Sequence, residues 1–390
     1  MRQLKLIYLG QLWSVGLILL LFGLTVRAET NSDLDLRADG DKESGSHVGP
    51  MNSILLNEIQ LIGSHNSFKK NIDSTLLFIL GLLDNKIAAG LDYAHLPLTE
   101  QLQLGLRSLE LDVFYDPEGG LYRMPLGSRL GPFSSEYDAD EVMKESGFKV
   151  MHVQDVDYRS HCLTLKICLE QIQDWSNRNP RHLPLIITIN PKDEIIPQAG
   201  FVQPLPFTAD TWESLDAEFI ETLSKFIVTP DDIRGSRKTL KESILAGWPS
   251  VDSLRGKVIF VLDASAPKIQ DYVASHPELK GRVMFVNLPE ESSMASFRIV
   301  NDPIANLDYI KKLVLEGFIV RTRADADTVE SRSGDDKRLK AAIDSGAQVI
   351  STDYYEMDLR HGTSFEVRLQ DASFFGCNHL LTSETCQLQE

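Results

Sequence analysis

The strongest constraint on the fold of this chain is a repeated alternation between short apolar, β-branched runs and segments with a helical pattern. Eight runs are candidate strands: 57–63, 107–115, 148–153, 183–190, 256–263, 282–288, 317–323 and 347–353. Helical patterns fill most of the gaps, at 99–106, 164–178, 212–227, 268–279, 305–317 and 335–346. Near-continuous apolar strands that alternate with helices indicate a parallel sheet covered on both faces. Eight such units predict a (β/α)8 barrel of the TIM type. An open doubly wound sheet is the alternative, but no Gly-rich phosphate loop follows the first run.

The N-terminus has the pattern of a cleavable secretory signal. Two basic residues precede an apolar run from Leu12 to Val26, and small residues flank Arg27 at a cleavage position after Ala28. A membrane anchor is the alternative, but the run is shorter than the roughly 20 residues that span a bilayer. We therefore expect residues 1–28 to be a signal peptide of a secreted, extracellular protein. The acidic, polar segment 29–52 is typical of a disordered leader.

Composition limits the partners of this chain. It has 390 residues and a net charge of −17, and removal of the signal would make it still more acidic. Such a surface repels nucleic acid, so we expect none as a partner. An anionic substrate would have to be captured by a metal ion or by a few placed cations. We expect a monomer.

The four cysteines are Cys162, Cys168, Cys377 and Cys386. In a secreted chain an even number indicates disulfides, and the short separations favour the two local pairs. A zinc site is the alternative, but no C-x-x-C spacing supports it. We place the barrel in residues 53–360 and a disulfide-closed extension in residues 361–390.

Polar residues stand where the predicted strands end, which in a barrel of this kind is the catalytic rim. Going along the chain they are His65 and Asn66, Glu110 and Asp112, His152, Asn190 and Lys192, Asp263, Arg321 and Arg323, and Asp353. The sequence therefore predicts that these side chains gather at one mouth.

Glu110 and Asp112 lie two residues apart on one strand, so their side chains point the same way. Two inward carboxylates repel each other unless a cation lies between them. With Asn66 they form an all-oxygen donor set, which suits Ca²⁺, or less well Mg²⁺, rather than zinc. The alternative is that one carboxylate points to solvent or pairs with an arginine in an ion-pair network.

Histidines at two strand ends suit paired proton transfer, since an imidazole titrates near neutral pH. His65 and His152 are the candidates. His95 precedes the second strand and is either part of an ordered loop or a substrate contact.

Several blocks in the same order resemble the secreted calcium-dependent phosphoinositide-type phospholipases C, within the PLC-like phosphodiesterase superfamily. The blocks are GSHNS, YAHLPLTEQLQLGLRSLELDV, VMHVQDVD, HCLTLKICLEQIQDWSNRNPRHLPLIITINPKDE, GWPSVDSLRGKVIFVLD, RTRADADT and SGAQVISTDYY. The resemblance runs from about Asn57 to the C-terminus. It implies a (β/α)8 barrel and calcium-dependent cleavage of phosphatidylinositol, or a related phospholipid or phosphodiester, through a cyclic phosphate.

The resemblance also implies roles for single residues. His65 and His152 match the two catalytic histidines, and Asp353 holds a position where an aspartate can support the first of them. Asn66, Glu110 and Asp112 match metal ligands. Lys192 matches a lysine expected to meet phosphate oxygens, a contact that we also predict for Arg321, Arg323 and His95.

One position departs from the family pattern: Asn190 stands where the family has a glutamate that binds calcium. Asparagine keeps an oxygen ligand but removes a negative charge, so calcium affinity should fall. Asp193 or Glu194 in the following loop could compensate. The alternatives are a glycerophosphodiesterase or sphingomyelinase D-like enzyme on the same barrel, and a weakened or non-catalytic member. A barrel glycosidase is disfavoured because its two carboxylates should come from separate strands.

The segment 74–85, STLLFILGLLDN, is apolar nearly all round and lies between the first two predicted strands. A helix of this kind is usually packed in a core. The alternative is an exposed apolar ridge that binds a membrane surface.

Overall fold

The computed structural model describes residues 53–129, 137–369, 372–383 and 385–390. The predicted signal peptide and leader, 1–28 and 29–52, lie outside the described residues. Residues 54–390 form one compact unit, so the barrel and the predicted extension belong to the same body.

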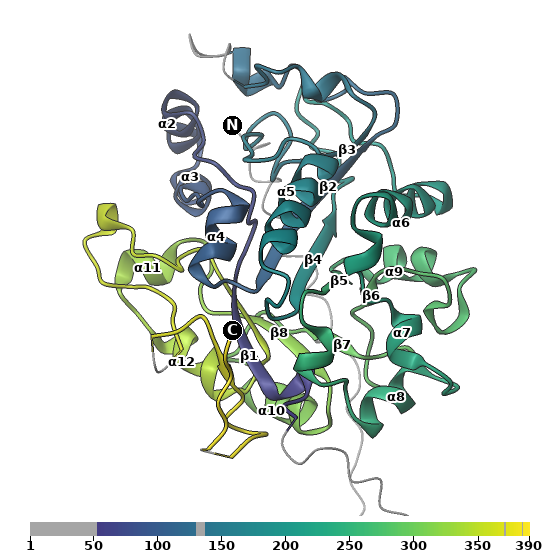
Figure 1. Cartoon of the computed structure of the whole chain (residues 1–390). Coiled ribbons are helices and arrows are strands. Elements are labelled where there is room, and N and C mark those ends of the chain that lie inside the picture. The colour runs from purple at the N-terminus through teal and green to yellow at the C-terminus, as the bar shows by residue number, and fades with distance from the viewer. Residues whose placement is uncertain (1–52, 130–136, 370–371, 384) are drawn as a thin grey trace, which may run out of the picture. The chain divides into compact units, whose positions relative to one another are not determined.

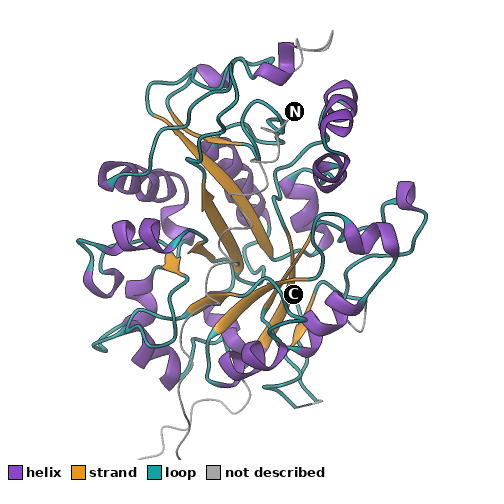
Figure 2. Cartoon of the chain, turned by 180° about the vertical axis from the view of Figure 1, so that it is seen from behind, coloured by secondary structure: helices purple, strands orange, loops and turns teal. Residues whose placement is uncertain are grey.

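Eight parallel strands form a nearly closed barrel, surrounded by helices (Figures 1 and 2). They are β1 (Ile59–Ser64), β2 (Ser108–Asp116), β4 (Leu185–Pro191), β5 (Val258–Leu262), β6 (Phe285–Val286), β7 (Phe297–Ile299), β8 (Ile319–Arg323) and β9 (Val349–Thr352). Their order in the sheet is β6-β5-β4-β2-β1-β9-β8-β7, and a parallel bridge between Asn287 and Phe297 joins the two ends. The predicted (β/α)8 barrel is confirmed.

One predicted barrel strand was wrong, and one barrel strand was missed. The run 148–153 is not a barrel strand: β3 (Gly147–Val150) pairs antiparallel with the outer half of β2 and makes a hairpin on the rim. The barrel strand that the sequence did not reveal is β7, which is only three residues long and contains Arg298. No helix of the described residues lies between β6 and β7, so the alternation of strands and helices fails at that point.

The helices are α2 (Ser74–Leu83), α3 (Asn85–Leu91), α4 (Leu98–Leu104), α5 (Leu165–Arg178), α6 (Ala209–Leu223), α7 (Pro230–Arg234), α8 (Leu240–Ala246), α9 (Ala266–Val273), α10 (Leu307–Leu315), α11 (Val329–Ser333) and α12 (Lys337–Asp344). In α5 the buried side chains recur every three or four residues, at Leu165, Leu169, Ile172 and Trp175. This spacing puts one apolar stripe of the helix against the barrel. Among the described residues no helix is long and apolar enough to cross a membrane.

Strands β1 and β2 approach each other very closely at Gly63, which pairs with Ser108. A Cβ atom on Gly63 would lie 2.5 Å from the Cβ of Ser108 and 2.6 Å from its carbonyl oxygen. Glycine is therefore required where the strand that carries His65 meets the strand that carries Glu110.

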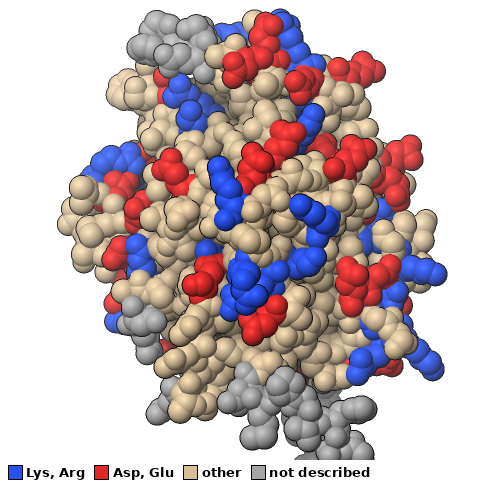
Figure 3. Space-filling model, in the orientation of Figure 1, with Lys and Arg blue, Asp and Glu red and all other residues tan. Residues whose placement is uncertain are grey.

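The C-terminal segment completes the barrel wall. β10 (Phe375–Cys377) pairs antiparallel with the first half of β1. The two local disulfides are present, Cys162–Cys168 and Cys377–Cys386, as the cysteine spacing predicted. On the face shown in Figure 3, acidic side chains are spread among the basic ones.

Candidate active site

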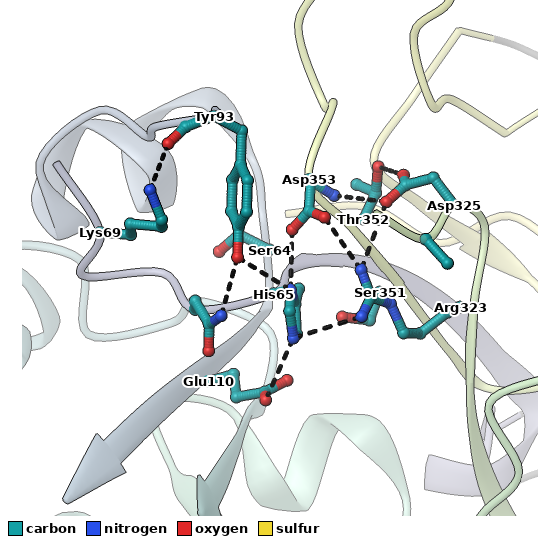
Figure 4. A network of polar contacts seen from close by, with 12 residues as sticks. Ser64, His65, Lys69, Tyr93, Glu110, Arg323, Asp325, Ser351, Thr352 and Asp353 are labelled. Carbon is teal, nitrogen blue, oxygen red and sulfur yellow. Dashed lines mark hydrogen bonds and ion pairs between the residues drawn. The ribbon is translucent and has the colours of Figure 1, made fainter. Parts of the chain in front are cut away.

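His65 lies at the mouth of the barrel, directly after β1, and charged groups surround its ring (Figure 4). Its Nδ1 is 2.8 Å from Oδ1 of Asp353, and Nη1 of Arg323 donates to its Nε2 at 3.3 Å. Oε1 of Glu110 lies 3.8 Å from the same Nε2. Burial, and then the charge of Arg323, lower the pKa of His65. In this arrangement Nδ1 carries the proton and Nε2 is the basic atom.

Asp353 follows β9 and is held on both sides. Nη2 of Arg323 donates to its Oδ2 at 2.9 Å, and its backbone N–H donates to Oδ1 of Asp325 at 3.0 Å. Burial alone would raise the pKa of Asp353, but the charges of His65 and Arg323 outweigh it and hold this pKa well below the usual range. Asp353 is therefore an ionised carboxylate fixed against the first histidine.

His152 lies at the same mouth, but it comes from the loop after β3 and not from the end of a barrel strand as predicted. Its Nδ1 is 2.8 Å from Oδ2 of Asp157. Both histidines are thus partly exposed rings whose Nδ1 contacts a buried aspartate. The sequence alone did not point to Asp157, although it stands five residues after His152 in VMHVQDVD.

The two carboxylates of β2 point into the mouth, and each contacts a cation of the chain. Glu110 forms a hydrogen-bonded ion pair with Arg321, and Oδ2 of Asp112 is 3.0 Å from Nζ of Lys192. Burial is the largest single influence and works to raise the pKa of Glu110, but the charges of Arg321, His65 and Arg323 together outweigh it and lower this pKa. For Asp112 burial prevails over Lys192 and raises the pKa to about 6. The predicted carboxylate pair is present, and so are the ion pairs that were its alternative.

The amide ligands predicted for calcium lie beside these carboxylates. Asn66 follows His65 at a positive φ of 51°, and its Nδ2 donates to Oη of Tyr93 at 2.8 Å, which leaves its Oδ1 for another partner. Asn190 sits opposite Asp112 in the pairing of β2 with β4. The four predicted ligands therefore come from the ends of three adjacent strands.

Three observations bear on whether these residues can hold calcium. Oδ1 of Asp112 is buried and has neither a hydrogen-bond nor an ion-pair partner among the described residues, whereas Oδ2 lies against Lys192, so a metal ion at Oδ1 would satisfy that oxygen. The donors are all oxygens, as calcium prefers. Within the described ranges, no group of three or more His, Cys, Asp or Glu side chains is placed to hold a metal ion. The set of two carboxylates and two amides fits a hard divalent cation, with less charge than a set of three carboxylates.

Asp193 and Glu194 in the following loop each contact a cation of the chain, as Glu110 and Asp112 do, and a role for them in binding calcium stays a prediction. Nζ of Lys268 lies 2.5 Å from Oδ1 of Asp193 and 3.3 Å from Oε1 of Glu194, and it also donates to the carbonyl of Pro191. Both acids that could have compensated for Asn190 are thus engaged by one lysine on α9.

The remaining predicted contacts divide into two groups. Lys192, Arg321 and Arg323 all reach the mouth, where each already contacts a carboxylate. His95 is buried, and its Nε2 lies 2.7 Å from the backbone carbonyl of His65. Burial lowers the pKa of His95 to about 4, so this ring is a neutral support for the backbone beneath His65. A substrate contact through His95 stays a prediction.

The comparisons with known proteins agree with the fold and with the sequence resemblance. The family model described as "Phosphoinositide phospholipase C, Ca2+-dependent" matches residues 54–379. A calcium-dependent phosphoinositol-specific phospholipase C from Pseudomonas sp, solved with myoinositol, aligns with a TM-score of 0.51 at 14% identity, over 86% of this chain and 100% of that one. The enzyme from Streptomyces antibioticus aligns with a TM-score of 0.50 at 15% identity, over 78% and 96%.

At these identities the structural likeness establishes the shared fold, while the family match covers most of the chain. No curated protein sequence matches it. Because the family model spans the whole barrel together with β10, this chain belongs to the calcium-dependent phosphoinositide phospholipase C family and is a phosphodiester-cleaving enzyme.

Proposed function

We propose that this enzyme cleaves phosphatidylinositol, or a closely related phosphodiester with a hydroxyl next to the phosphate, through a cyclic phosphate. The observation that carries the proposal is the pair of histidines at one barrel mouth, each with Nδ1 against a buried aspartate, so that Nε2 is the ring atom that exchanges a proton with substrate. One ring serves as base and the other as acid. Such proton transfers contribute about 10²–10⁴-fold each to a rate.

His65 is the base in this scheme. Its Nε2 takes the proton of the attacking hydroxyl while Asp353 stabilises the imidazolium that forms. Arg323 currently donates to the same Nε2, so we expect its guanidinium to turn toward a phosphate oxygen when substrate binds. His152 is the acid, and it gives a proton to the oxygen of the departing alcohol, which for a phosphoinositide is diacylglycerol.

Asn66, Glu110, Asp112 and Asn190 are the residues that would hold calcium. When bound there, calcium would lower the pKa of the attacking hydroxyl and offset charge on the phosphoryl oxygens. Lys192 and Arg321 stand beside these ligands and are the side chains placed to contact the phosphate.

The test is cleavage of phosphatidylinositol and of glycerophosphoinositol by the mature protein, with calcium titrated against a chelator. Calcium-dependent release of diacylglycerol and cyclic inositol phosphate is the expected result. Cleavage of the deacylated substrate alone would favour the glycerophosphodiesterase alternative. Loss of all cleavage at every calcium level would contradict the proposed substrate class.

Helix α2 is the part of this enzyme that we expect to contact the membrane. It follows β1 and so stands on the catalytic rim. Leu76 and Leu80 pack inward, whereas Phe78 is 67% exposed and Leu82 is 72% exposed. The solvent-facing side of the helix therefore carries large apolar side chains. An exposed apolar ridge next to the catalytic mouth is suited to insert among the lipids of a membrane surface.

Replacement of Phe78 and Leu82 by serine should reduce cleavage of phosphatidylinositol in vesicles and spare cleavage of a soluble ester of the same headgroup. Leu315→Ser is the matched control. It is 63% exposed but ends α10, next to the start of β8, and so lies at the opposite end of the barrel. Equal loss on both substrates in the α2 variant would contradict the membrane contact.

A further inference from the structure

Behind His152 lies the buried carboxylate of Asp157, a residue for which the family resemblance implied no role. Oδ2 of Asp157 lies 2.8 Å from Nδ1 of His152. The Asp157 side chain is fully buried, while the His152 ring is 13% exposed. A carboxylate in this position accepts a hydrogen bond from Nδ1–H and leaves Nε2 toward the mouth.

The backbone fixes this contact. The N–H groups of His152 and Val153 both donate to the carbonyl of Asp157, at 3.1 Å each, and the N–H of Asp157 donates back to the carbonyl of Val153 at 2.9 Å. The chain thus folds back on itself within five residues, and the aspartate is held beneath the histidine. The pairing does not depend on a flexible side chain reaching across a gap.

The carboxylate is itself held by a buried lysine. The side chain of Lys69 is fully buried, and its Nζ lies 3.3 Å from Oδ2 of Asp157. The same Nζ donates to the carbonyls of Leu91 at 2.9 Å and Tyr93 at 2.6 Å, the second of which Figure 4 shows. The ammonium group thus donates hydrogen bonds to two carbonyls and forms an ion pair with the carboxylate. Lys69 can therefore balance the charge of Asp157 without access to water.

The first histidine has the same arrangement. There Asp353 accepts from Nδ1 of His65, and Arg323 contacts Asp353. Each histidine at the mouth is thus backed by an aspartate, and each aspartate by a cation from a different part of the chain. In each case the cation balances the charge of the aspartate, and the aspartate accepts from Nδ1–H and so orients the ring.

We propose that Asp157 is the positioning residue of His152 and that Lys69 holds Asp157 in place for this task. The inference rests on the proposed function. As the attacking oxygen forms its bond to phosphorus, the bond from phosphorus to the leaving oxygen breaks, and that oxygen takes the proton from Nε2 of the His152 imidazolium. The ring returns to the neutral form that keeps its proton on Nδ1, against Asp157. His65 has taken the hydroxyl proton, so no further reactant is needed.

The test compares two leaving groups on the same inositol phosphate. Diacylglycerol is a poor leaving group that needs a proton, whereas 4-nitrophenolate is stable as an anion and leaves without one. We expect Asp157→Asn to slow kcat for phosphatidylinositol by about 10²-fold or more and to slow kcat for the 4-nitrophenyl ester by less than about tenfold, because only the first reaction uses the acid. Lys69→Met should change the ratio of the two rates in the same direction.

Asp155→Asn is the matched control. Asp155 is a buried acid two residues away in the same turn, but its Oδ1 and Oδ2 accept from the backbone N–H groups of Leu126 and Val202, at 2.6 Å each, and not from His152. The Asp155→Asn change should destabilise these loops and lower kcat for the two substrates by the same factor. The ratio of the two rates should therefore stay unchanged. A merely structural role for Asp157 predicts the same behaviour in Asp157→Asn, and that result would overturn the proposal.

A second measurement uses only the wild-type protein and does not depend on catalytic activity. In wild-type protein labelled with ¹⁵N-histidine, at alkaline pH, the nitrogen shifts of the His152 ring should report the Nδ1–H tautomer. An Nε2–H tautomer would refute the positioning role. If wild type cleaves neither ester, the proposed function fails, and the tautomer alone then decides on Asp157.

Discussion

His95 should make the protein lose stability in mild acid. Its Nε2–H donates to the backbone carbonyl of His65, so its other nitrogen, Nδ1, is unprotonated, and Nδ1 is buried without a hydrogen-bond partner in the described residues. Protonation would bury both a charge and a donor with nothing to accept from it. This is the physical reason that the pKa of His95 falls from 6.5 to about 4, with burial as the main cause.

The sign and size of the effect follow by linkage. Between pH 6.5 and about 4 the unfolded chain binds a proton at His95 that the folded chain does not, so the free energy of unfolding falls as the pH falls through this range. The difference between the two pKa values corresponds to roughly 3 kcal/mol at the acid end. Stability is not affected by this group above the unfolded pKa.

The assay is urea unfolding of wild type and His95→Gln at several pH values from 7 to 4. Glutamine keeps an N–H that can donate to the carbonyl of His65 but does not titrate. We expect the variant to be less stable at pH 7, because its packing is poorer, and to lose roughly 3 kcal/mol less than wild type on going to pH 4. Parallel curves for the two proteins over the whole range would show that His95 does not titrate in this way.

Three further outcomes are expected at the mouth of the barrel. His65→Ala and His152→Ala should each lower kcat for phosphatidylinositol by about 10²–10⁴-fold, as measured by release of inositol phosphate, and retention of wild-type activity in either would refute its assignment. Asn190→Glu should bind calcium more tightly than wild type in calorimetry, because it adds a negative ligand, and unchanged affinity would place Asn190 outside the metal site. Gly63→Ala should lower stability by about 1–3 kcal/mol in thermal unfolding, since its Cβ would press on Ser108, and a neutral result would show that β1 and β2 can separate.

The fold was predictable where strand patterns are long and apolar. β4 and β5 are buried at nearly every position, and the sequence marks both. β7 could not be found, because three residues with an arginine at the centre carry no strand pattern of their own, and it is the neighbouring strands that make Phe297–Ile299 a strand. β3 was found as a strand but given the wrong partner, since hydrophobicity does not tell a rim hairpin from a barrel strand.

The candidate site was predictable where a residue stands next to the end of a strand. His65, Lys192 and Asp353 were placed correctly at the mouth because a strand end fixes their position. The supporting residues were not found, since Lys69 comes from the long connection between β1 and β2 and meets Asp157 and the ring of Tyr93 only in three dimensions. Such contacts depend on loop conformation, which no periodic pattern records.

The charges at the mouth bear on how an acidic chain can hold an anionic substrate. Four of its carboxylates each contact a cation of the chain: Glu110 with Arg321, Asp112 with Lys192, Asp353 with Arg323, and Asp157 with Lys69. These pairs nearly cancel, while the whole chain has a net charge of −17. A phosphodiester therefore gains little from the resident charges, and the attraction has to come from an added cation.

We accordingly expect calcium and inositol 1,2-cyclic phosphate to bind cooperatively. A divalent cation bound among these ion pairs adds net positive charge, which a bound anion offsets. By linkage, calcium and the cyclic phosphate must then raise each other's affinity by the same factor, about 5–150-fold in known cases. Calorimetric titration of calcium with and without the cyclic phosphate measures that factor. Asp112→Asn should reduce calcium affinity while leaving Arg321 and Arg323 for the phosphate. Calcium affinity that is the same with and without the phosphate would mean that the arginines and Lys192 capture the anion alone, and that the ion pairs open when substrate enters.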